Sequence, residues 1–543
     1  MKLYNKVKFL NIINNAPPPG ARPSRSATMQ PAQNPDGTPR PAAADTTRET
    51  NRFVKSVLRA LMTARSINFT YVHTDGTLLP GYLPKTHLFG LDHDLTAPGL
   101  PFILGKQYGL PELYDIAANQ NGWYTGSSEY LNTPLSSLLT ETITLRTALE
   151  PFRGFNIQVD ARRRLARNRE VYYRNLVNDS TLVPVPDPFR PGRFLLAEHP
   201  LLGTGSFNAS TVTIQTLFGD LGANGETSRA FNRFVKNRQF VQQRLRDANP
   251  NKNGQYGFNS QEVLVQSFID AYHGRSSDGY EAKKFDPFSL FPLPNWRLDY
   301  NGFADLPLIK KYFTSFTLNH AYSSTYSVGS YTTSTVYNPD VFNPDRDFPN
   351  LLNATGQFVP YYIVGQVSII ERLAPLVGVN FQTVSRATGR LEYRTDRAVV
   401  LNTTNSQVTE LYTNEVILGL GYATNSLKLP FKVGGEQRVL RNNLTARLDL
   451  SIRDNISVQR SILDVVDPLT DPTTPEGRVG RAQGQITNGS RTFQLRPTID
   501  YLLNTRLNLQ LYYSQTITTP RISNAFRNST TEGGVQLRYS LGQ

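Results

Sequence analysis

Hydrophobic and polar residues alternate along long stretches of the C-terminal third of the chain. From Leu444 to Arg453 every second residue is apolar, and the residues between are polar or charged. Successive side chains of a β-strand point to opposite faces, so this period of two predicts a strand with one apolar and one charged face. The pattern recurs at Phe493–Leu503, Arg506–Ile517 and Gly534–Leu541.

The length of these segments indicates that the strands cross a membrane. Each covers roughly 8–12 residues, close to the ~9–11 that a tilted transmembrane strand needs, whereas most strands have ~5–6. The connection Asn504–Thr505 is short, while Pro468–Ser490 and Thr518–Glu532 are long and polar. Short turns on one side and long loops on the other are typical of outer-membrane barrels. The sequence therefore predicts an all-β fold, a section of a transmembrane antiparallel β-barrel. A soluble antiparallel sandwich, which also alternates, is the alternative.

The cost of burying charge in lipid predicts which face meets the membrane. An Arg or Lys at the midplane of the lipid face costs roughly 2–4 kcal/mol, so the charged face is predicted to line the lumen. The lumen-facing candidates are Arg447, Asp449, Arg453, Arg496, Asp500 and Arg538. The lipid-facing candidates are Leu444, Leu448, Leu450, Leu495, Ile499, Leu509, Leu511 and Leu537. A proline within a strand removes a ladder donor, so Pro497 predicts a bulge.

Further strands follow the same rule upstream. At ~10 residues per span they bring the total to roughly fifteen. They are predicted at Phe53–Leu61, Ser66–Thr74, Leu139–Leu149, Phe155–Arg164, Ala209–Leu217, Phe313–Val328, Tyr361–Glu371, Leu376–Ser385, Leu391–Val399 and Glu415–Ala423.

A helical insertion interrupts the strands. Ser228–Asp247 and Ser260–Tyr272 are predicted to be helices, because apolar residues of the first recur at helical spacing. Those apolar residues are Phe231, Val235, Val241 and Leu245, and the other face carries Arg229, Arg233, Lys236, Arg244 and Arg246. We expect the insertion to pack on the barrel rim or inside the barrel; a cargo-binding helix is the alternative.

These elements divide the chain into five parts. A barrel strand is expected at 1–15 and a Pro-rich loop at 16–51, because the latter lacks the apolar residues needed for a core. Barrel strands with loops follow at 52–223, the helical insertion at 224–290 and the C-terminal barrel strands at 291–543.

The composition agrees with a β-barrel and limits the classes of molecule that this protein is expected to bind. Hydrophobic residues make up 39% and charged residues 18% of the 543 positions, and no apolar run approaches the ~18 residues of a transmembrane helix. The formal net charge of +14 favours an anionic partner. The basic residues are spread singly rather than clustered with stacking aromatics, so no nucleic-acid partner is predicted.

Nothing in the sequence indicates catalysis. Cysteine is absent, which excludes disulfides, thiol chemistry and cysteine-based zinc sites. The six histidines show no metal-ligand spacing, and Asp92-His93-Asp94 is interpreted as a solvated loop. There is no P-loop, nucleophile elbow or dinucleotide fingerprint. No enzyme activity, cofactor or metal is therefore expected.

Several segments have amino-acid sequences that are more specific than a β-barrel fold alone requires. They are Gly76–Gly90, Gln120–Ser127, Asn259–Tyr272, Phe291–Gly302 and Leu318–Thr333, the last reading LNHAYSSTYSVGSYTT. With the C-terminal strands, they resemble the SprA/Sov family, the very large outer-membrane translocons of the type IX secretion system in gliding and protein-secreting Bacteroidota. The similarity runs from Leu3 to the last strand.

The resemblance implies a function and partners. Members of the SprA/Sov family form one giant barrel of 36 strands. Folded cargo with a C-terminal sorting domain, including gliding adhesins, leaves the periplasm through this barrel. Their partners are outer-membrane lipid, a smaller shuttle barrel, a plug protein and periplasmic accessory proteins. Members are several times longer than 543 residues, and Met1–Asn15 lacks the features of a secretory signal. We therefore expect this chain to be the C-terminal part of such a protein.

Two other functions remain open from the sequence. A TonB-dependent uptake or receptor barrel needs an N-terminal plug domain, for which the stretch before Arg52 is too short. A secreted β-rich adhesin is the third class, and it differs from both barrels in being soluble without detergent.

Overall fold

The computed structural model describes residues 64–541, apart from 126–130, 177, 179–182, 184, 187, 189–200, 219–227, 281–286, 289, 338–346, 429–438, 441, 463–483, 505 and 523–524. Within this part of the chain, fourteen strands form one antiparallel sheet. The predicted all-β class is therefore confirmed.

Twelve strands lie side by side in the order β1-β2-β3-β4-β6-β8-β9-β10-β13-β14-β15-β16, while β5 pairs with β3 and β6, and β7 pairs with β6. Their bounds are β1 Ala64–Leu78, β2 Leu135–Leu149, β3 Phe155–Val171, β4 Leu202–Ser210, β5 Asn295–Tyr300, β6 Phe313–Thr333, β7 Tyr362–Val364, β8 Gln366–Thr383, β9 Ala387–Asn402, β10 Gln407–Thr424, β13 Leu444–Ser461, β14 Gln485–Asn504, β15 Leu507–Pro520 and β16 Asn528–Tyr539. A separate hairpin pairs β11 (Leu427–Lys428) with β12 (Val439–Leu440).

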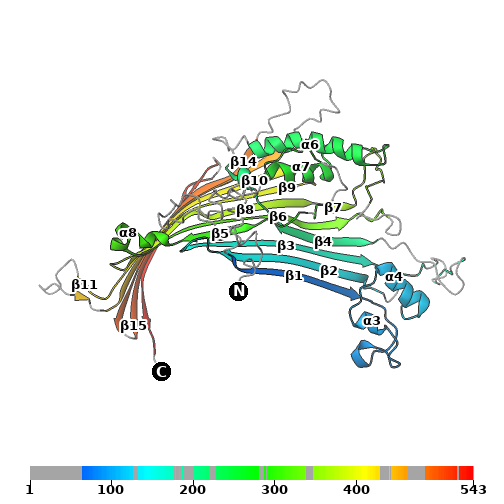
Figure 1. The fold of residues 1–543 in the computed structure, drawn as a ribbon, viewed down its shortest axis with the longest axis horizontal. Helices are drawn as coiled ribbons and strands as arrows, with labels where there is room; N and C mark the ends of the chain where they lie inside the picture. The colour runs from blue at the N-terminus through cyan, green and yellow to red at the C-terminus, as the bar shows by residue number, and fades with distance from the viewer. Residues whose placement is uncertain are drawn as a thin grey trace, which may run out of the picture.

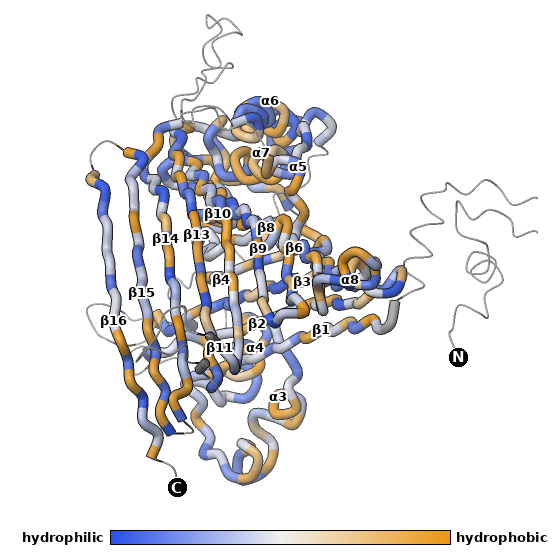
Figure 2. Tube along the Cα trace, turned by 90° about the vertical axis from the view of Figure 1, so that its left-hand side faces the viewer, coloured by the Kyte–Doolittle hydropathy of each residue, from blue (hydrophilic) through white to orange (hydrophobic). Residues whose placement is uncertain are grey.

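The sheet is strongly curved and open (Figure 1). Among the described residues, β1 and β16 stand at the two ends of the strand order and do not pair with each other. Figure 2 shows hydrophobic and hydrophilic positions following one another along β13–β16.

The two ends of the strands differ in their connections. At one end, which we call the turn end, several strands are joined by short segments, namely 150–154, 384–386 and 505–506. At the other, the helical end, connections such as 79–134 and 211–294 are long and hold most of the helices (Figure 1). The helices are α3 Leu100–Ile103, α4 Leu110–Tyr114, α5 Ile214–Leu217, α6 Arg229–Ala248, α7 Gln261–Tyr272 and α8 Pro307–Tyr312, with shorter turns at Leu88–Gly90 and Gly302–Asp305 and a π-helix at Asp115–Gln120.

The two predicted helices of the insertion are confirmed as α6 and α7. The Ser228 hydroxyl caps α6 by accepting a hydrogen bond from the Phe231 amide at 3.2 Å. The apolar side of α6 is buried, whereas Arg229, Lys236 and Arg244 of its basic side are exposed. An amphipathic helix of this kind is stabilised mainly by packing its apolar side against another element.

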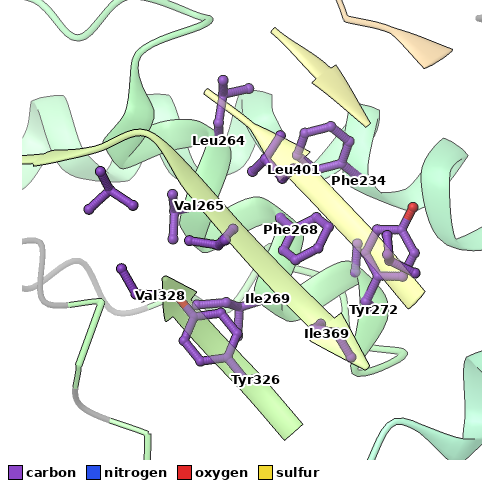
Figure 3. Packing of buried hydrophobic residues seen from close by; sticks show 14 of the residues in the cluster. Phe234, Leu264, Val265, Phe268, Ile269, Tyr272, Tyr326, Val328, Ile369 and Leu401 are labelled. Atoms are coloured by element: carbon purple, nitrogen blue, oxygen red, sulfur yellow. The ribbon is translucent and has the colours of Figure 1, made fainter. Parts of the chain in front are cut away.

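The largest core lies between this helical layer and one face of the sheet. Phe234, Phe268 and Tyr272 of the helices meet Ile369 and Leu401 of the strands (Figure 3). All five side chains are buried. The layer therefore covers the sheet near its helical end rather than standing apart from it.

Three predicted strands differ from the structure in their boundaries. The predicted strand Ala209–Leu217 is wrong, because β4 ends at Ser210 and Ile214–Leu217 is helical. The Thr216 hydroxyl donates to the Tyr272 carbonyl at 2.7 Å, so this segment bonds to the helical layer instead of a ladder. The predicted strands Tyr361–Glu371 and Leu376–Ser385 are largely one strand, β8, which continues past Pro375 through a register shift between Leu373 and Val377.

The bulge predicted at Pro497 is also wrong. Leu448 pairs with Pro497 in an unbroken stretch of the β13–β14 register. The pairing of β14 with β15 omits Arg496 and Pro497 but resumes at Thr498 without a shift. The missing N–H is thus tolerated without an extra residue.

Other predicted segments end elsewhere or cannot be compared. The connection predicted at Thr518–Glu532 is shorter, since β15 ends at Pro520 and β16 begins at Asn528, whereas the one predicted at Pro468–Ser490 lies nearer the N-terminus, since β13 ends at Ser461 and β14 begins at Gln485. The strand at 1–15, the loop at 16–51 and the strand Phe53–Leu61 lie outside the described residues.

Candidate functional site

The candidate site is one whole face of the sheet. Residues that pair across antiparallel strands point to the same side, so the register assigns every strand residue to a face. Leu450 pairs with Leu418 and with Leu495, whereas Asp449 pairs with Gly419 and Arg496. We call the side of Leu450 the apolar face and the side of Asp449 the polar face.

The register assigns all fourteen residues singled out in the sequence to one of the two faces. The pairing from β13 to β16 places on the apolar face Leu444, Leu448, Leu450, Leu495, Ile499, Leu509, Leu511 and Leu537. It places on the polar face Arg447, Asp449, Arg453, Arg496, Asp500 and Arg538.

The apolar face carries a continuous band toward the turn end. On β13 the band runs from Leu444 to Ile452, a length close to the ~9–11 residues that a tilted strand needs to cross a bilayer hydrocarbon core. On the other strands the same rows hold Ile67, Phe69, Leu145, Ile157, Val159, Trp296, Leu298, Leu318, Val379, Leu391, Tyr393, Val416, Leu418 and Leu420. Nearer the helical end, the helical layer covers this same face.

The polar face is crossed by arginine–carboxylate pairs. Glu392 accepts from Arg390 Nε at 2.6 Å and from Arg394 Nη2 at 2.7 Å. Arg394 also lies 4.0 Å from Glu415 of the neighbouring strand β10. Charge-assisted pairs of this kind are stronger than neutral hydrogen bonds, and here they hold charged groups in place on an accessible wall.

The structure brings together some of the predicted polar residues and separates others. Asp449 is directly opposite Arg496, and Arg453 is directly opposite Glu415. Arg538 stands apart on β16 and pairs with Asn508.

Sequence reasoning did not single out the charged group on β9. Glu392, Arg394 and Asp396 occupy every second position of the predicted strand Leu391–Val399, and Arg390 directly precedes it in the same strand β9. The alternation was therefore sufficient to find them. Glu392 pairs with Arg390 and Arg394 of its own strand, and only the contact of Arg394 with Glu415 of β10 depended on the register.

The polar face is also hollowed. One depression of about 440 Å³ is lined by residues of β6, β8, β9, β10 and β13, and another of about 390 Å³ adjoins it. A third, of about 450 Å³, lies over β1–β3 and is lined by Asn68, Arg146 and Asp160.

A second set of charged residues, which the sequence did not reveal, attaches the helical layer to the apolar face. Arg397 Nη2 lies 2.6 Å from Glu371 Oε2, and Arg460 Nε lies 3.1 Å from Glu410 Oε2, with all four side chains buried. Arg397 also donates from Nη1 to the Thr216 carbonyl of α5 at 2.6 Å.

Glu410 completes this attachment to α6 and α7. It accepts from the Tyr272 hydroxyl at 2.6 Å and from the Ser228 hydroxyl at 3.1 Å. Burial and the neighbouring Glu410 carboxylate raise the pKa of Tyr272, so this hydroxyl keeps its proton and donates. The residues of these contacts are far apart in sequence, which is why no local pattern predicted them.

Burial shifts two further groups of the helical layer. It raises the pKa of Glu262, in the first turn of α7, to about 7. It lowers the pKa of His273, which follows α7, because the charged imidazolium loses hydration.

The described residues show neither a membrane-spanning helix nor a metal site. None of their helices is long and apolar enough to cross a bilayer. In the same part of the chain, no group of three or more His, Asp or Glu residues is arranged to hold a metal ion.

The two faces define the class of protein. A long-stranded antiparallel sheet with an apolar band about as tall as a hydrocarbon core, and a charged opposite face, is a section of outer-membrane β-barrel wall.

Comparison with known proteins gives no family. No protein-family model and no curated protein matches the chain. Among solved structures, the RagAB peptide transporter is similar at 8% identity and a TM-score of 0.22, over 72% of this chain and 37% of that one. OmpT, an outer membrane protein of Vibrio cholerae, is similar at 9% identity and a TM-score of 0.17, over 87% and 98% of the two chains.

A third similar structure is the ferric-catecholate import receptor Fiu from E. coli K12. It shares 7% identity at a TM-score of 0.19, over 84% of this chain and 56% of that one. The chain thus spans about a third of the RagAB structure's chain and just over half of the Fiu chain. These TM-scores are low, so the similarity to these structures carries no functional conclusion for this chain.

Proposed function

We propose that this chain is part of the wall of a protein-conducting outer-membrane barrel, the translocon of the type IX secretion system. The apolar band meets lipid and the polar face lines the lumen. By the usual orientation of outer-membrane barrels, the turn end faces the periplasm and the helical end faces outward.

The width of the polar face carries this proposal. Twelve strands lie side by side without closing, and at about 4.8 Å per strand they cover an arc of roughly 50 Å. Barrels of about eight strands are filled by their own side chains, so a wall of this size surrounds a much wider lumen. Charged residues across that wall keep it hydrated and give a passing protein no apolar surface to adhere to.

The sequence resemblance supplies the cargo and partners of this proposal. The cargo is a folded protein with a C-terminal sorting domain, including gliding-motility adhesins. The partners are outer-membrane lipid, a smaller shuttle barrel, a plug protein and periplasmic accessory proteins. No covalent chemistry and no cofactor takes part.

Depletion of the protein in cells that make it tests the proposal. Cargo bearing the sorting domain is expected to accumulate in the periplasm, while unrelated outer-membrane proteins assemble normally. Unchanged secretion together with a loss of nutrient uptake would overturn the proposal in favour of a TonB-dependent-type uptake barrel. Recovery of the protein in the soluble fraction without detergent would overturn both the translocon and the uptake barrel.

A further inference from the structure

A small group of charged residues lies on the apolar face, immediately beyond the apolar band toward the helical end. On β13 the band ends at Ile452, and the next residue on the same face is Asp454. Asp454 pairs with Arg491 of β14, which pairs in turn with Thr519 of β15. Arg521 follows two residues later, just past the end of β15. We call Asp454, Arg491, Thr519 and Arg521 the boundary cluster.

The boundary cluster lies at the depth of lipid headgroups. β13, β14 and β15 stand side by side (Figure 2), and Ile452, Phe493 and Ile517 form the row of the apolar face next to the cluster. The band on β13 is about as long as a strand needs to cross the hydrocarbon core, so the next row stands at the edge of that core. An arginine on the lipid-facing side of a barrel costs least at this depth.

Arg521 holds the carboxylate of the cluster in place. Its Nε donates to Asp454 Oδ1 at 2.7 Å, and its Nη2 donates to Asp454 Oδ2. The Arg521 amide donates to the Gly489 carbonyl, and a Cβ on Gly489 would lie 3.2 Å from the Cβ of Arg521. Gly489 therefore leaves room for the arginine side chain, which reaches across β14 to β13.

Arg491 keeps most of its hydrogen-bonding capacity. Its Nη2 lies 3.4 Å from Asp454 Oδ2, a long contact, and 64% of its side chain is exposed. Among the described residues, Asp454 is the one carboxylate within ion-pair distance of Arg491 or Arg521. Two guanidinium groups thus share one carboxylate, which leaves one positive charge uncompensated. The exposed Thr519 beside Arg491 adds a hydroxyl donor.

A phosphate group fits this arrangement. The planar fork of an arginine matches phosphate oxygens in a bidentate manner, and charge-assisted hydrogen bonds of this kind are strong. A phospholipid places its phosphate at the edge of the hydrocarbon core while its acyl chains cover apolar surface. A lipid therefore gains from both the cluster and the band below it, whereas a free phosphate ion gains only from the cluster.

We infer that the boundary cluster binds the phosphate of an anionic lipid headgroup, with Arg491 as the main contact and the acyl chains along the apolar band. The inference rests on the proposed function, which places the apolar band in lipid. It adds to that function a headgroup site at the helical end of the band.

Native mass spectrometry of the full-length protein in detergent tests the site. Phosphatidic acid, which has a terminal phosphate, is compared with phosphatidylcholine of the same acyl chains, in which choline covers the phosphate. We expect tighter binding of phosphatidic acid. Arg491→Gln should weaken that binding about tenfold, as for loss of a charge-assisted hydrogen bond, and leave the binding of phosphatidylcholine unchanged.

Two further variants distinguish a lipid site from a purely structural ion pair. Arg453→Gln is the matched control, because Arg453 lies on the polar face at nearly the same level and should affect neither lipid. Asp454→Asn removes the anion that competes with the phosphate, so phosphatidic acid should bind more tightly. Each variant is compared after heat-modifiable gel mobility shows that it is folded.

Four results would overturn the inference. They are equal binding of the two lipids, equal effects of Arg491→Gln and Arg453→Gln, equal losses from Arg491→Gln and Asp454→Asn, and displacement of phosphatidic acid by inorganic phosphate at equal concentration. The third would mean that the cluster only joins three strands, and the fourth that it is a site for free ions.

The outcomes separate this inference from the proposed function. If depletion of the protein blocks secretion but Arg491→Gln does not alter lipid binding, the headgroup site is wrong and the translocon stands. If depletion leaves secretion unchanged, the translocon fails whatever the lipids do.

Discussion

Leu448 and Arg447 are neighbours on β13 and lie on opposite faces of the sheet. Leu448 belongs to the apolar band, while Arg447 lies on the polar face. Substitution of these two adjacent residues therefore tests which face of the sheet meets lipid.

We expect Leu448→Arg to impair assembly far more than Arg447→Leu. The first places a charge among lipid chains at a cost of roughly 2–4 kcal/mol, and the second only removes a charge from a hydrated wall. Heat-modifiable gel mobility of the full-length variants measures the folded fraction. Equal damage from the two substitutions would contradict the assignment of the faces.

Glu262 makes the stability of the helical layer dependent on pH. Its side chain is buried in α7, near the Tyr256 and Tyr337 hydroxyls, whose pKa values are raised mainly by burial and to a smaller extent by the charge of Glu262. The folded layer keeps the Glu262 proton up to about pH 7, whereas an unfolded glutamate releases it near 4.5. Stability is therefore lost as pH rises between these values, by about 3 kcal/mol in total.

We expect Glu262→Gln to stabilise the layer at pH 8 and to have little effect near pH 4. His273 acts in the opposite direction, since its lowered pKa removes stability as pH falls. Comparing wild type with the variant at each pH cancels that contribution. Hydrogen exchange of the α7 amides is the measurement, and an equal difference at both pH values would refute the role given to Glu262.

At the scale of elements, the helical layer and the strands are joined by buried ion pairs. The Arg460–Glu410 and Arg397–Glu371 pairs lie between α5–α7 and the sheet, next to the apolar core. A buried pair contributes little net stability over an apolar contact of the same shape, but breaking it leaves one charge uncompensated.

We expect Arg460→Met to loosen the helical layer by about 3–5 kcal/mol, because Glu410 then remains buried without its arginine. The double variant Arg460→Met with Glu410→Gln should recover much of that loss. Lys236→Met, on the exposed side of α6, is the control. Protease accessibility of the layer reports the change, and similar effects from Lys236→Met and Arg460→Met would show that the pair does not hold the layer.

At the scale of the whole molecule, the sheet presents two edges. β1 and β16 each have one neighbouring strand among the described residues, and the apolar side chains of β16 are well exposed, at 67% for Val535 and 61% for Leu537. An unpaired edge exposes a row of N–H and C=O groups, which is costly in lipid and promotes aggregation in water.

We expect residues 1–543, refolded alone in detergent, to give no monodisperse closed barrel. Closing would require β1 to pair with β16 at a tighter curvature than the sheet has. Because the chain has no cysteine, Tyr71→Cys with Val535→Cys gives a clean disulfide probe of that seam. Efficient crosslinking in a protease-resistant monomer would contradict this expectation, and aggregated or rapidly digested material would agree with it.

The sequence by itself determined most of the long strands, their two faces and the two main helices. Each is a matter of local period: alternation separates Leu448 from Arg447, and helical spacing gathers Phe231 and Val235 on one side of α6. A side chain's face depends on its own strand, so no knowledge of neighbours was needed.

Tertiary structure alone decided which charges meet. The two buried pairs join Glu371 with Arg397 and Glu410 with Arg460, each from two neighbouring strands whose register brings the partners together. Register likewise decided that Gly419 of β10 lies between Arg390 of β9 and Asp449 of β13. Alternation fixes the face of a residue but not its partner, because the partner depends on how neighbouring strands slide past one another before they pair.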